Sequence, residues 1–345
     1  MSRHKKGIPI NGWIALDKPA GMTSTQAVGK VRRIMNAQKI GHGGTLDPLA
    51  TGILPIALGE ATKTIPYIQD HLKTYIFTVQ WGEQRSTDDM EGEVIATSAH
   101  RPSQQDIENI LSRFTGEIMQ TPPQFSAIKI DGERAYDIAR EGGTVDLKPR
   151  LVYVESLELI PQSSSRKMRS VCPGFRPPQD DLTARTPDQV RGDGSEIAGE
   201  KADATTFRCV CGKGTYIRSL GRDMALSLGS VGYISALRRE NVGPLGPGNA
   251  ISLEKLEENH HSALLPVDTV LDGIPALPIH QQEAARLKQG QALSFISRPD
   301  AERLRQAGIE IGPEPITALA VYDGNPVALV TIEGIDIWPL RVLNL

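Results

Sequence analysis

The segment from Gly41 to Gly52 (GHGGTLDPLATG) presents a single carboxylate, that of Asp47, between glycines and a proline. The next acidic residue along the chain is Glu60. Glycines let the backbone adopt positive φ or approach a bulky ligand closely, and Pro48 fixes φ immediately after the acid. A lone carboxylate held in this way suits a nucleophile better than a general acid and base pair. An aspartate before a proline is also a common turn residue, so both interpretations stay open at this point.

Other chemistries fit the sequence poorly. Lys213 lies between two glycines, but a P-loop needs Ser or Thr after the lysine and a further glycine upstream. The seven histidines are scattered, whereas a metal-dependent hydrolase needs clustered ligands. The three cysteines, at positions 172, 209 and 211, form neither a disulfide framework nor a four-ligand zinc site. We therefore expect no metal and no other cofactor.

The composition is that of a soluble globular protein. The chain has 345 residues, of which 39% are hydrophobic and 23% charged, and this length favours two domains. No apolar run approaches the ~18 residues of a membrane-spanning helix, and the basic start Met1–Lys6 precedes no apolar core. We expect a protein of the reducing cytoplasm with no membrane partner, and no protein partner is evident.

Positive charge is concentrated although the net charge is −3. Residues 1–40 carry eight basic side chains and one acidic side chain. A second basic group consists of Arg218, Arg222, Arg238 and Arg239. Because both groups flank the candidate active-site segments, their distribution predicts a track that binds phosphates, which the overall charge does not indicate.

Helix and strand signals mix without a regular βαβ repeat, which favours an α+β fold. Thr23 and Gln26 form a predicted capping box before a helix, and Ser103 is expected to cap a second helix that extends to Phe114. Alternating apolar residues predict strands over 73–81 and 207–211. A glycine-rich turn should then lead into a helix that carries Arg218 and Arg222 on one face, one toward the site and one toward solvent or phosphate.

Two regions depart from this pattern. Residues 162–204 are rich in Pro, Ser and Gly, have balanced charge and lack apolar periodicity, so we expect a disordered insertion there. Residues 265–276 resemble a domain junction. Short alternating stretches such as 318–322 and 327–330 then predict a small β-rich barrel, although residues 276–345 carry six basic and eight acidic side chains.

Several blocks in order along the chain resemble the tRNA pseudouridine-55 synthase family, TruB type. The Gly41–Gly52 segment is similar to the catalytic motif of that family, and Leu58–Lys63 continues it. The resemblance covers most of residues 9–160 and 205–245, and ordered blocks are far more specific than any one motif. The other blocks are Asn11–Gly12, Leu16–Ser24, Lys73–Tyr75, Arg85–Gly92, Pro122–Lys129 and Gly212–Leu220.

The resemblance implies a fold, a domain organisation and an activity. The fold would be the pseudouridine synthase fold, with a mixed, mostly antiparallel sheet. Residues 1–270 would form the catalytic domain, including the 162–204 insertion, and 276–345 a PUA-like RNA-binding domain. The activity would be isomerisation of uridine to pseudouridine at position 55, in the T loop of tRNA. That reaction needs no cofactor, and the buried target base must be flipped out to react.

The same resemblance assigns roles to single residues. Asp47 would be the nucleophile, Tyr75 would stack on the target base, and Arg218 would pair with Asp47. The substrate-binding residues implied are His42, Tyr216, Leu237, Lys18, Lys63 and Asp89. His42 would help to displace the target base, Tyr216 and Leu237 would pack around it, and the two lysines would contact phosphates. Asp89 fits the spacing of the family to Gly92 better than Asp88 does.

Two other functions were weighed against an RNA-modifying isomerase. A non-catalytic module of the same fold could bind or fold tRNA, but loss of Asp47, Tyr75 or Arg218 would then be expected, and all three are present. A related synthase that uses a guide RNA is disfavoured by the bacterial-style blocks and the modest length.

Overall fold

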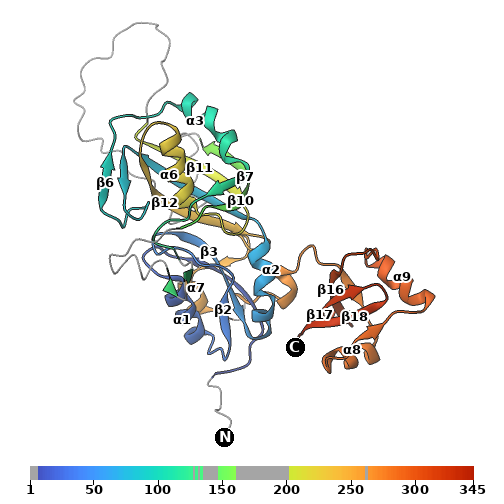
Figure 1. Ribbon diagram of the computed structural model, residues 1–345. Helices are drawn as coiled ribbons and strands as arrows, with labels where there is room; N and C mark the ends of the chain where they lie inside the picture. Colours follow the sequence, from blue (N-terminus) through green and yellow to red (C-terminus); the bar gives the residue numbers. More distant parts are fainter. Residues whose placement is uncertain (1–6, 127–128, 131–132, 135–146, 161–201, 261–262) are drawn as a thin grey trace, which may run out of the picture.

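The computed structural model of the protein describes residues 7–126, 129–130, 133–134, 147–160, 202–260 and 263–345. Figure 1 shows a large body, coloured blue to light orange, and a smaller orange-to-red lobe beside it. No helix in the described part of the chain is long and apolar enough to cross a membrane.

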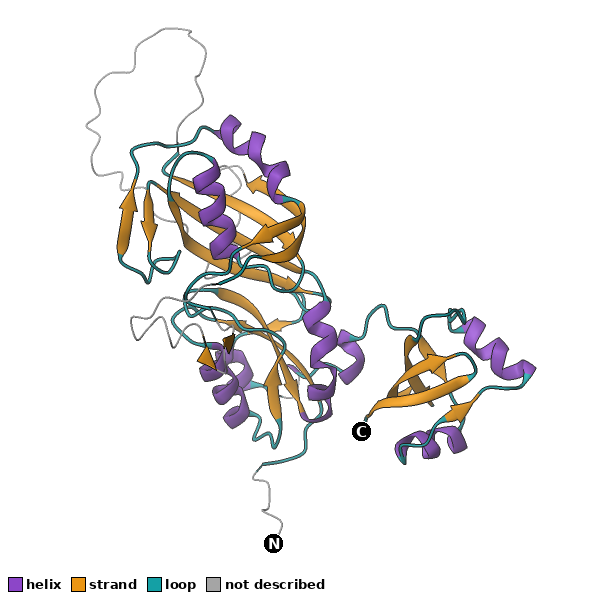
Figure 2. Ribbon diagram, viewed as in Figure 1, coloured by secondary structure: helices purple, strands orange, loops and turns teal. Residues whose placement is uncertain are grey.

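The body is built on one mixed sheet, which the described residues form from nine strands. Most neighbours are antiparallel, and only β1 with β13 and β3 with β12 run parallel. The expectation of an α+β fold with a mostly antiparallel sheet is confirmed (Figure 2). In spatial order the strands are β13 (Ala250–Ile251), β1 (Gly12–Lys18), β3 (Thr51–Leu58), β12 (Gly232–Val242), β4 (Lys73–Trp81), β11 (Ala204–Cys211), β10 (Arg150–Ile160) and β7 (Gly116–Gln120), with β2 (Ile40–His42) paired to β3.

Strand β4 occupies the residues that alternation predicted. Its side chains at every second position face the main core, where the rings of Phe77 and Phe207 stack with their centroids 5.3 Å apart. Cys209 and Cys211 lie on the same face of β11 and are buried free thiols. Aromatic and apolar partners on neighbouring strands stabilise a sheet through such cross-strand contacts. Strand β4, which carries Tyr75, is therefore anchored by the main core against which it packs.

The predicted helix starts are confirmed by their caps. Thr23 and Gln26 form a capping box before α1 (Ser24–Ile34), and Ser103 forms one before α3 (Gln104–Leu111). The second helix is shorter than expected, because Phe114 belongs to the 3-10 turn η2 (Ser112–Phe114) that follows α3. Helix α6 (Ile217–Ser227) begins after the glycine-rich turn and packs on β12.

The remaining elements of the body are short and peripheral. They are the 3-10 helices η1 (Gly59–Thr64) and η5 (Val267–Val270), helices α2 (Ile65–Asp70) and α7 (Leu253–Glu258), and the paired strands β5 (Glu83–Arg85) with β6 (Val94–Thr97) and β8 (Lys129–Ile130) with β9 (Glu133–Arg134).

The C-terminal lobe is β-rich, as the sequence predicts, but its strands form an open sheet. Its order is β14 (Ala276–Pro278), β16 (Ile316–Tyr322), β17 (Asn325–Glu333), β18 (Asp336–Val342) and β15 (Leu293–Ser294), and among the described residues β14 does not pair with β15 to close a barrel. Helices α8 (Gln281–Lys288) and α9 (Arg298–Gln306) complete the lobe.

The lobe shares a core with the body. Leu319, Leu329 and Leu343 are buried in one cluster with Trp13 and Ile68. The expected junction at 265–276 is also partly fixed, because Trp13 pairs with Leu265 and donates through Nε1 to the carbonyl of Val267 at 3.3 Å. These contacts tie the lobe to the first strand of the body.

The proposed insertion falls mostly outside the described residues, which resume at Ala202. Its predicted end at residue 204 is wrong, since β11 begins at Ala204. Asp203 is also part of the fold: its carbonyl accepts from the Trp81 amide at 2.9 Å, and its carboxylate meets Arg101 Nε at 3.0 Å. A polar residue immediately before β11 therefore fixes the start of that strand, and the apolar pattern of β11 gives no sign of it.

The ends of the 161–201 segment lie close together, because Ile160 in β10 stands opposite Thr206 in β11. We predict that a short Gly-Ser turn in place of 161–201 preserves the fold and turnover. A loop roughly tenfold shorter costs up to ~2 kcal/mol less closure entropy, so stability should be unchanged or slightly higher. Melting temperature and turnover check this, and a large fall in either would show that the segment contributes to the body.

Candidate active site

Asp47 lies in the loop between β2 and β3, residues 43–50, here called the Asp47 loop. Ser24, the first residue of α1, holds the loop because its hydroxyl accepts from the Leu46 amide at 2.8 Å and donates to the Leu46 carbonyl at 3.0 Å. The Leu46 side chain is buried in the core next to the acid. These contacts fix the residue immediately before Asp47.

Lys18 fixes the residue immediately after it. The lysine side chain is fully buried, and its Nζ donates to the carbonyls of Pro19, Met22 and Pro48 at 2.8–3.3 Å. Burial lowers the pKa of Lys18 to about 8, while the nearby Asp47 carboxylate opposes that shift. The ammonium is thus used within the protein, so the structure places Lys18 as a brace for the Asp47 loop and leaves it no phosphate contact.

Arg239 clamps both sides of the Asp47 loop. Its guanidinium is buried and donates to the carbonyls of Gly44, Thr45 and Ile53 at 3.1, 3.3 and 2.8 Å. Gly52 makes this possible: its φ is +101°, and a Cβ there would lie 2.1 Å from the backbone oxygen of Arg239. The glycine is therefore needed for the close approach of β12 to β3, rather than for an approach to a ligand.

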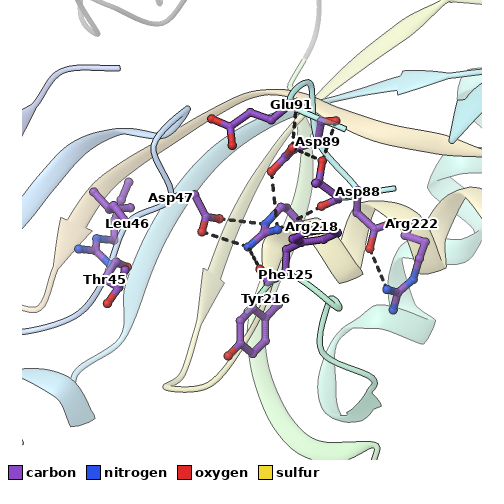
Figure 3. Close-up of polar contacts among 12 residues, drawn as sticks. Thr45, Leu46, Asp47, Asp88, Asp89, Glu91, Phe125, Tyr216, Arg218 and Arg222 are labelled. Atoms are coloured by element: carbon purple, nitrogen blue, oxygen red, sulfur yellow. Dashed lines mark hydrogen bonds and ion pairs between the residues drawn. The ribbon is translucent and has the colours of Figure 1, made fainter. Parts of the chain in front are cut away.

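Arg218 forms a two-pronged ion pair with Asp47 (Figure 3). Its Nε and Nη2 donate to the two carboxylate oxygens at 2.9 and 3.0 Å. The arginine side chain is only 5% exposed, whereas that of Asp47 is 32% exposed. Paired, charge-assisted hydrogen bonds of this kind fix the plane of a carboxylate. The predicted pair is present, and the acid keeps an open side.

The same guanidinium also donates to the carbonyls of Thr87 and Phe125, at 3.1 and 3.0 Å. Asp89 is the second carboxylate near it, 3.6 Å from Nη1. Burial raises the pKa of Asp89, and its hydrogen bond from Thr87 opposes this. The preference for Asp89 over Asp88 thus agrees with the geometry around Arg218, since Asp88 pairs with Arg222 instead.

Glu91 is a third carboxylate at this end of the site. It is drawn beside Asp89 in Figure 3. Burial raises the pKa of Glu91, and the charges of Asp89 and Asp47 raise it further. The carboxylates of Asp47, Asp89 and Glu91 therefore lie around the buried Arg218. The positive charge of Arg218 offsets their mutual repulsion.

Tyr75 is partly buried in β4 and packs against the main core. Burial raises the pKa of its phenol, while the Arg239 guanidinium and its contact with the phenol lower it. Arg239 stands opposite Tyr75 in the register of β12 and β4. Because Arg239 also holds the Asp47 loop, one side chain links the expected nucleophile and the expected stacking residue.

Tyr216 and Leu237 line the same region from neighbouring elements. The backbone of Tyr216 is held by the Gln120 amide, which accepts from the tyrosine N–H at 2.7 Å and donates to its carbonyl at 3.0 Å. Burial raises the pKa of the Tyr216 phenol. Leu237 is buried opposite Phe77 and belongs to the core, so its packing is set before any ligand binds.

His42 borders the Asp47 loop, whereas Lys63 contacts the C-terminal lobe. His42 is partly exposed at the end of β2, and its Nδ1 accepts from the Gly44 amide at 3.4 Å. Burial and the nearby Arg239 lower its pKa. Lys63 pairs with Glu60 at 2.6 Å and donates to the carbonyl of Val342 at 2.7 Å. Lys63 thus fastens the C-terminal lobe to the body.

The second basic group does not form the expected phosphate track. Arg218, Arg238 and Arg239 are almost fully buried, and Arg222 is largely buried. Arg238 pairs through both Nη atoms with Asp17 at 2.9 Å. Sequence alone could not separate an arginine that meets phosphate from one that meets a carboxylate far away along the chain. The group holds the site together from within.

Sequence reasoning missed several residues that build the site. Ser24, Gln120 and Arg239 act through contacts with backbone atoms, for which no spacing rule exists. Arg239 had a signal, because an arginine in an apolar strand pattern must find partners when it is buried. Among the residues described, no group of three or more His, Cys, Asp or Glu could hold a metal ion.

The arrangement presents one oriented, partly open carboxylate beside a phenol, with its charge held by a buried guanidinium. A carboxylate of this kind can add to an electrophilic carbon or accept a proton, and the phenol can stack on a flat ring. Both are linked through Arg239, which contacts the Asp47 loop and the Tyr75 phenol.

Comparison with known proteins indicates the same family as the sequence motifs. Residues 32–172 match the model of the TruB family pseudouridylate synthase, N-terminal domain. The tRNA pseudouridine synthase B of Rhodospirillum rubrum is 45% identical over all of both chains, and that of Caulobacter vibrioides is 43% identical over all of both chains.

Solved structures share the fold at lower identity. One chain of a Cbf5-Nop10-Gar1 complex has a TM-score of 0.64 and 24% identity, covering 96% of this chain and 84% of its own. A chain from an H/ACA RNP bound to a substrate RNA has a TM-score of 0.64 and 21% identity, covering 99% and 91%. With the sequence relatives matching end to end, the chain belongs to the TruB family of pseudouridylate synthases.

Proposed function

We propose that this protein is a tRNA pseudouridine-55 synthase that isomerises a uridine of the T loop, with Asp47 as the nucleophile. The observation that carries the proposal is the buried, two-pronged pair of Arg218 with a half-open Asp47. Family membership and full-length relatives that are named tRNA pseudouridine synthase B support the isomerisation and the class of RNA.

The reaction breaks the bond between C1′ and N1 of uridine and forms one between C1′ and C5. A proton leaves C5 and another arrives at N1, so atoms and charge balance without an oxidant or a metal. The enzyme must supply a nucleophile, retain the freed uracil and move protons. Asp47 serves the first need, since its oxygens are fixed in one plane while one side stays open to a ligand.

Tyr75 serves the second need by stacking on the uracil while it turns. Its ring is anchored by the core strand β4, and burial raises the pKa of a phenol that is already neutral at physiological pH. A neutral ring suits stacking on an uncharged base. Tyr216 and Leu237 complete the walls, since Tyr216 is locked by Gln120 and Leu237 by the core.

A uridine within the folded T loop reaches Asp47 only when it is extruded from the stack. His42 is placed to assist, because it stands partly exposed at the strand end that leads into the Asp47 loop. Its lowered pKa keeps the imidazole neutral at physiological pH, which suits insertion among bases better than a charged group. The residue thus acts on the RNA fold rather than on the reacting bond.

The two lobes have different roles. Residues 1–270 form the catalytic domain, and 276–345 form a PUA-like domain that contacts RNA away from the reacting base. Trp338 and Arg341 are both exposed on β18. An exposed aromatic ring can stack on a base, and an exposed arginine can contact a phosphate. Every residue with a proposed chemical role lies in the catalytic domain.

The nucleophile is tested by Asp47→Asn, which removes the charge but keeps the shape. Pseudouridine formation should fall below detection, while tRNA affinity should stay within about tenfold, or ~1.4 kcal/mol, because asparagine keeps the shape of the side chain and only its charge is lost. Mass-shift mapping of pseudouridine and equilibrium binding measure the two effects.

The matched control is Asp70→Asn, because Asp70 also pairs with a basic residue, Lys213, but both side chains are more than half exposed. This variant should retain normal turnover. Measurable turnover by Asp47→Asn above contamination would sink the nucleophile role.

The RNA-binding role of the C-terminal lobe is tested by Trp338→Ala with Arg341→Gln. Removing the whole lobe would expose the shared core around Trp13, so surface substitutions are the cleaner test. Affinity for tRNA should fall by about 1–3 kcal/mol for one lost stacking contact, with the single-turnover rate at saturating enzyme unchanged.

Tyr322→Ala is the control for that variant, since Tyr322 is an exposed aromatic residue elsewhere in the same lobe. It should bind tRNA normally. If the saturated rate collapses in Trp338→Ala with Arg341→Gln while affinity holds, the lobe takes part in assembling the active site and the proposed division is wrong.

A further inference from the structure

Helix α6 presents two arginines to the active site, Arg218 and Arg222, which are one helical turn apart. Residues four positions apart lie on the same face of a helix. Arg218 meets Asp47, the Thr87 carbonyl and the Phe125 carbonyl, as described above. Arg222 contacts the same two loops one step further from Asp47, at Asp88 (Figure 3) and at Thr121.

All three nitrogens of the Arg222 guanidinium donate hydrogen bonds. Its Nη1 donates to Asp88 and its Nη2 to the Thr121 carbonyl, both at 2.9 Å. Its Nε donates to Asp223, also at 2.9 Å. The Ser219 hydroxyl donates to the same Thr121 carbonyl at 2.8 Å. Thus α6 contacts residues 87–89 at Thr87, Asp88 and Asp89, and residues 121–125 at Thr121 and Phe125.

The pair of Asp88 and Arg222 is largely shielded from water, with side chains that are 9% and 17% exposed. Burial raises the pKa of Asp88, and the Arg222 charge opposes that rise. Asp88 also has a φ of +59°, a conformation that a non-glycine residue adopts only when its surroundings hold it. Its carbonyl accepts from the Ile234 amide at 3.0 Å.

We propose that the Asp88–Arg222 pair is a positioning pair for catalysis. It holds the Thr87–Asp89 turn so that the Thr87 carbonyl and the Asp89 carboxylate lie 3.1 and 3.6 Å from Arg218. Arg218 in turn holds both oxygens of Asp47. The pair itself touches neither Asp47 nor the space on its open side. The inference rests on the proposed role of Asp47 and adds a residue pair that acts through Arg218.

The role of the Asp88–Arg222 pair determines which measured quantity should change when the pair is removed. A residue that only stabilises the fold would lower the melting temperature without changing the rate of folded enzyme. A residue that binds RNA would weaken affinity. A residue that aligns the nucleophile should lower the rate of the bound reaction, because small displacements of a catalytic group cost large factors in rate.

The experiment compares Arg222→Gln, Asp88→Asn, the double variant and Arg222→Lys in the full-length protein. For each, the single-turnover rate at saturating enzyme, the tRNA affinity and the melting temperature are measured. Lys213→Gln is the matched control, because Lys213 forms an ion pair with Asp70 that is 73% and 61% exposed. An exposed pair of this kind contributes little, so the control should match the parent protein.

We expect each single neutral variant to lose about tenfold or more in saturated rate, with affinity changed by no more than about twofold. The double variant should be no slower than the slower single one, since removing both charges leaves no unpaired buried ion. Arg222→Lys should recover part of the rate, because an ammonium can still pair with Asp88.

The proposal is overturned if the folded single variants react at the parent rate, or if the losses of the two variants add in the double. It is also overturned if affinity falls while the saturated rate holds. Where Arg222→Gln does not fold, Asp88→Asn decides, since the parent rate in that folded variant would contradict the proposal. Failure of the nucleophile role would instead appear as turnover by Asp47→Asn, whatever the result here.

Discussion

The ion pair between Arg218 and Asp47 is the interaction on which the rest of the site depends. The Arg218 side chain is nearly sealed in the protein and that of Asp47 stays one-third exposed, so the pair faces water on the Asp47 side. A buried guanidinium must use its donors, because an unpaired buried charge costs several kcal/mol by order of magnitude. Asp47, two carbonyls and Asp89 meet that need, which ties the orientation of the carboxylate to the integrity of three loops.

The surrounding arginines extend this constraint in two directions. Arg239 fixes the Asp47 loop to the strand that carries Tyr75, so that Asp47 and the tyrosine ring are held relative to each other. Arg222 fixes the loops that Arg218 itself grips. Lys18 closes the set from β1, using its ammonium on the carbonyl after Asp47. A count of charges would assign these cationic side chains to RNA binding. Instead, they hold polar backbone groups in place where water is excluded.

Much of the fold was predictable because its signals are local. Capping boxes at Thr23 and Ser103 and the alternation of β4 are properties of a few neighbouring residues. The family was recognisable from the Gly41–Gly52 motif and the blocks that follow it. The partners of the buried arginines were not, since Asp17 and Arg238, or Asp88 and Arg222, are joined only by the folded sheet. The open sheet of the C-terminal lobe and its core shared with Trp13 also depend on long-range packing.

The measurement that tests this account most directly is the single-turnover rate of Arg218→Lys at saturating enzyme. Lysine keeps the positive charge but cannot hold both oxygens of Asp47 and the carbonyls of Thr87 and Phe125 together. If the geometry of the pair sets the reactivity of Asp47, the rate should fall by about a hundredfold or more while tRNA binding persists. A rate close to that of the parent protein would mean that charge alone suffices, and would contradict the central role given to this pair.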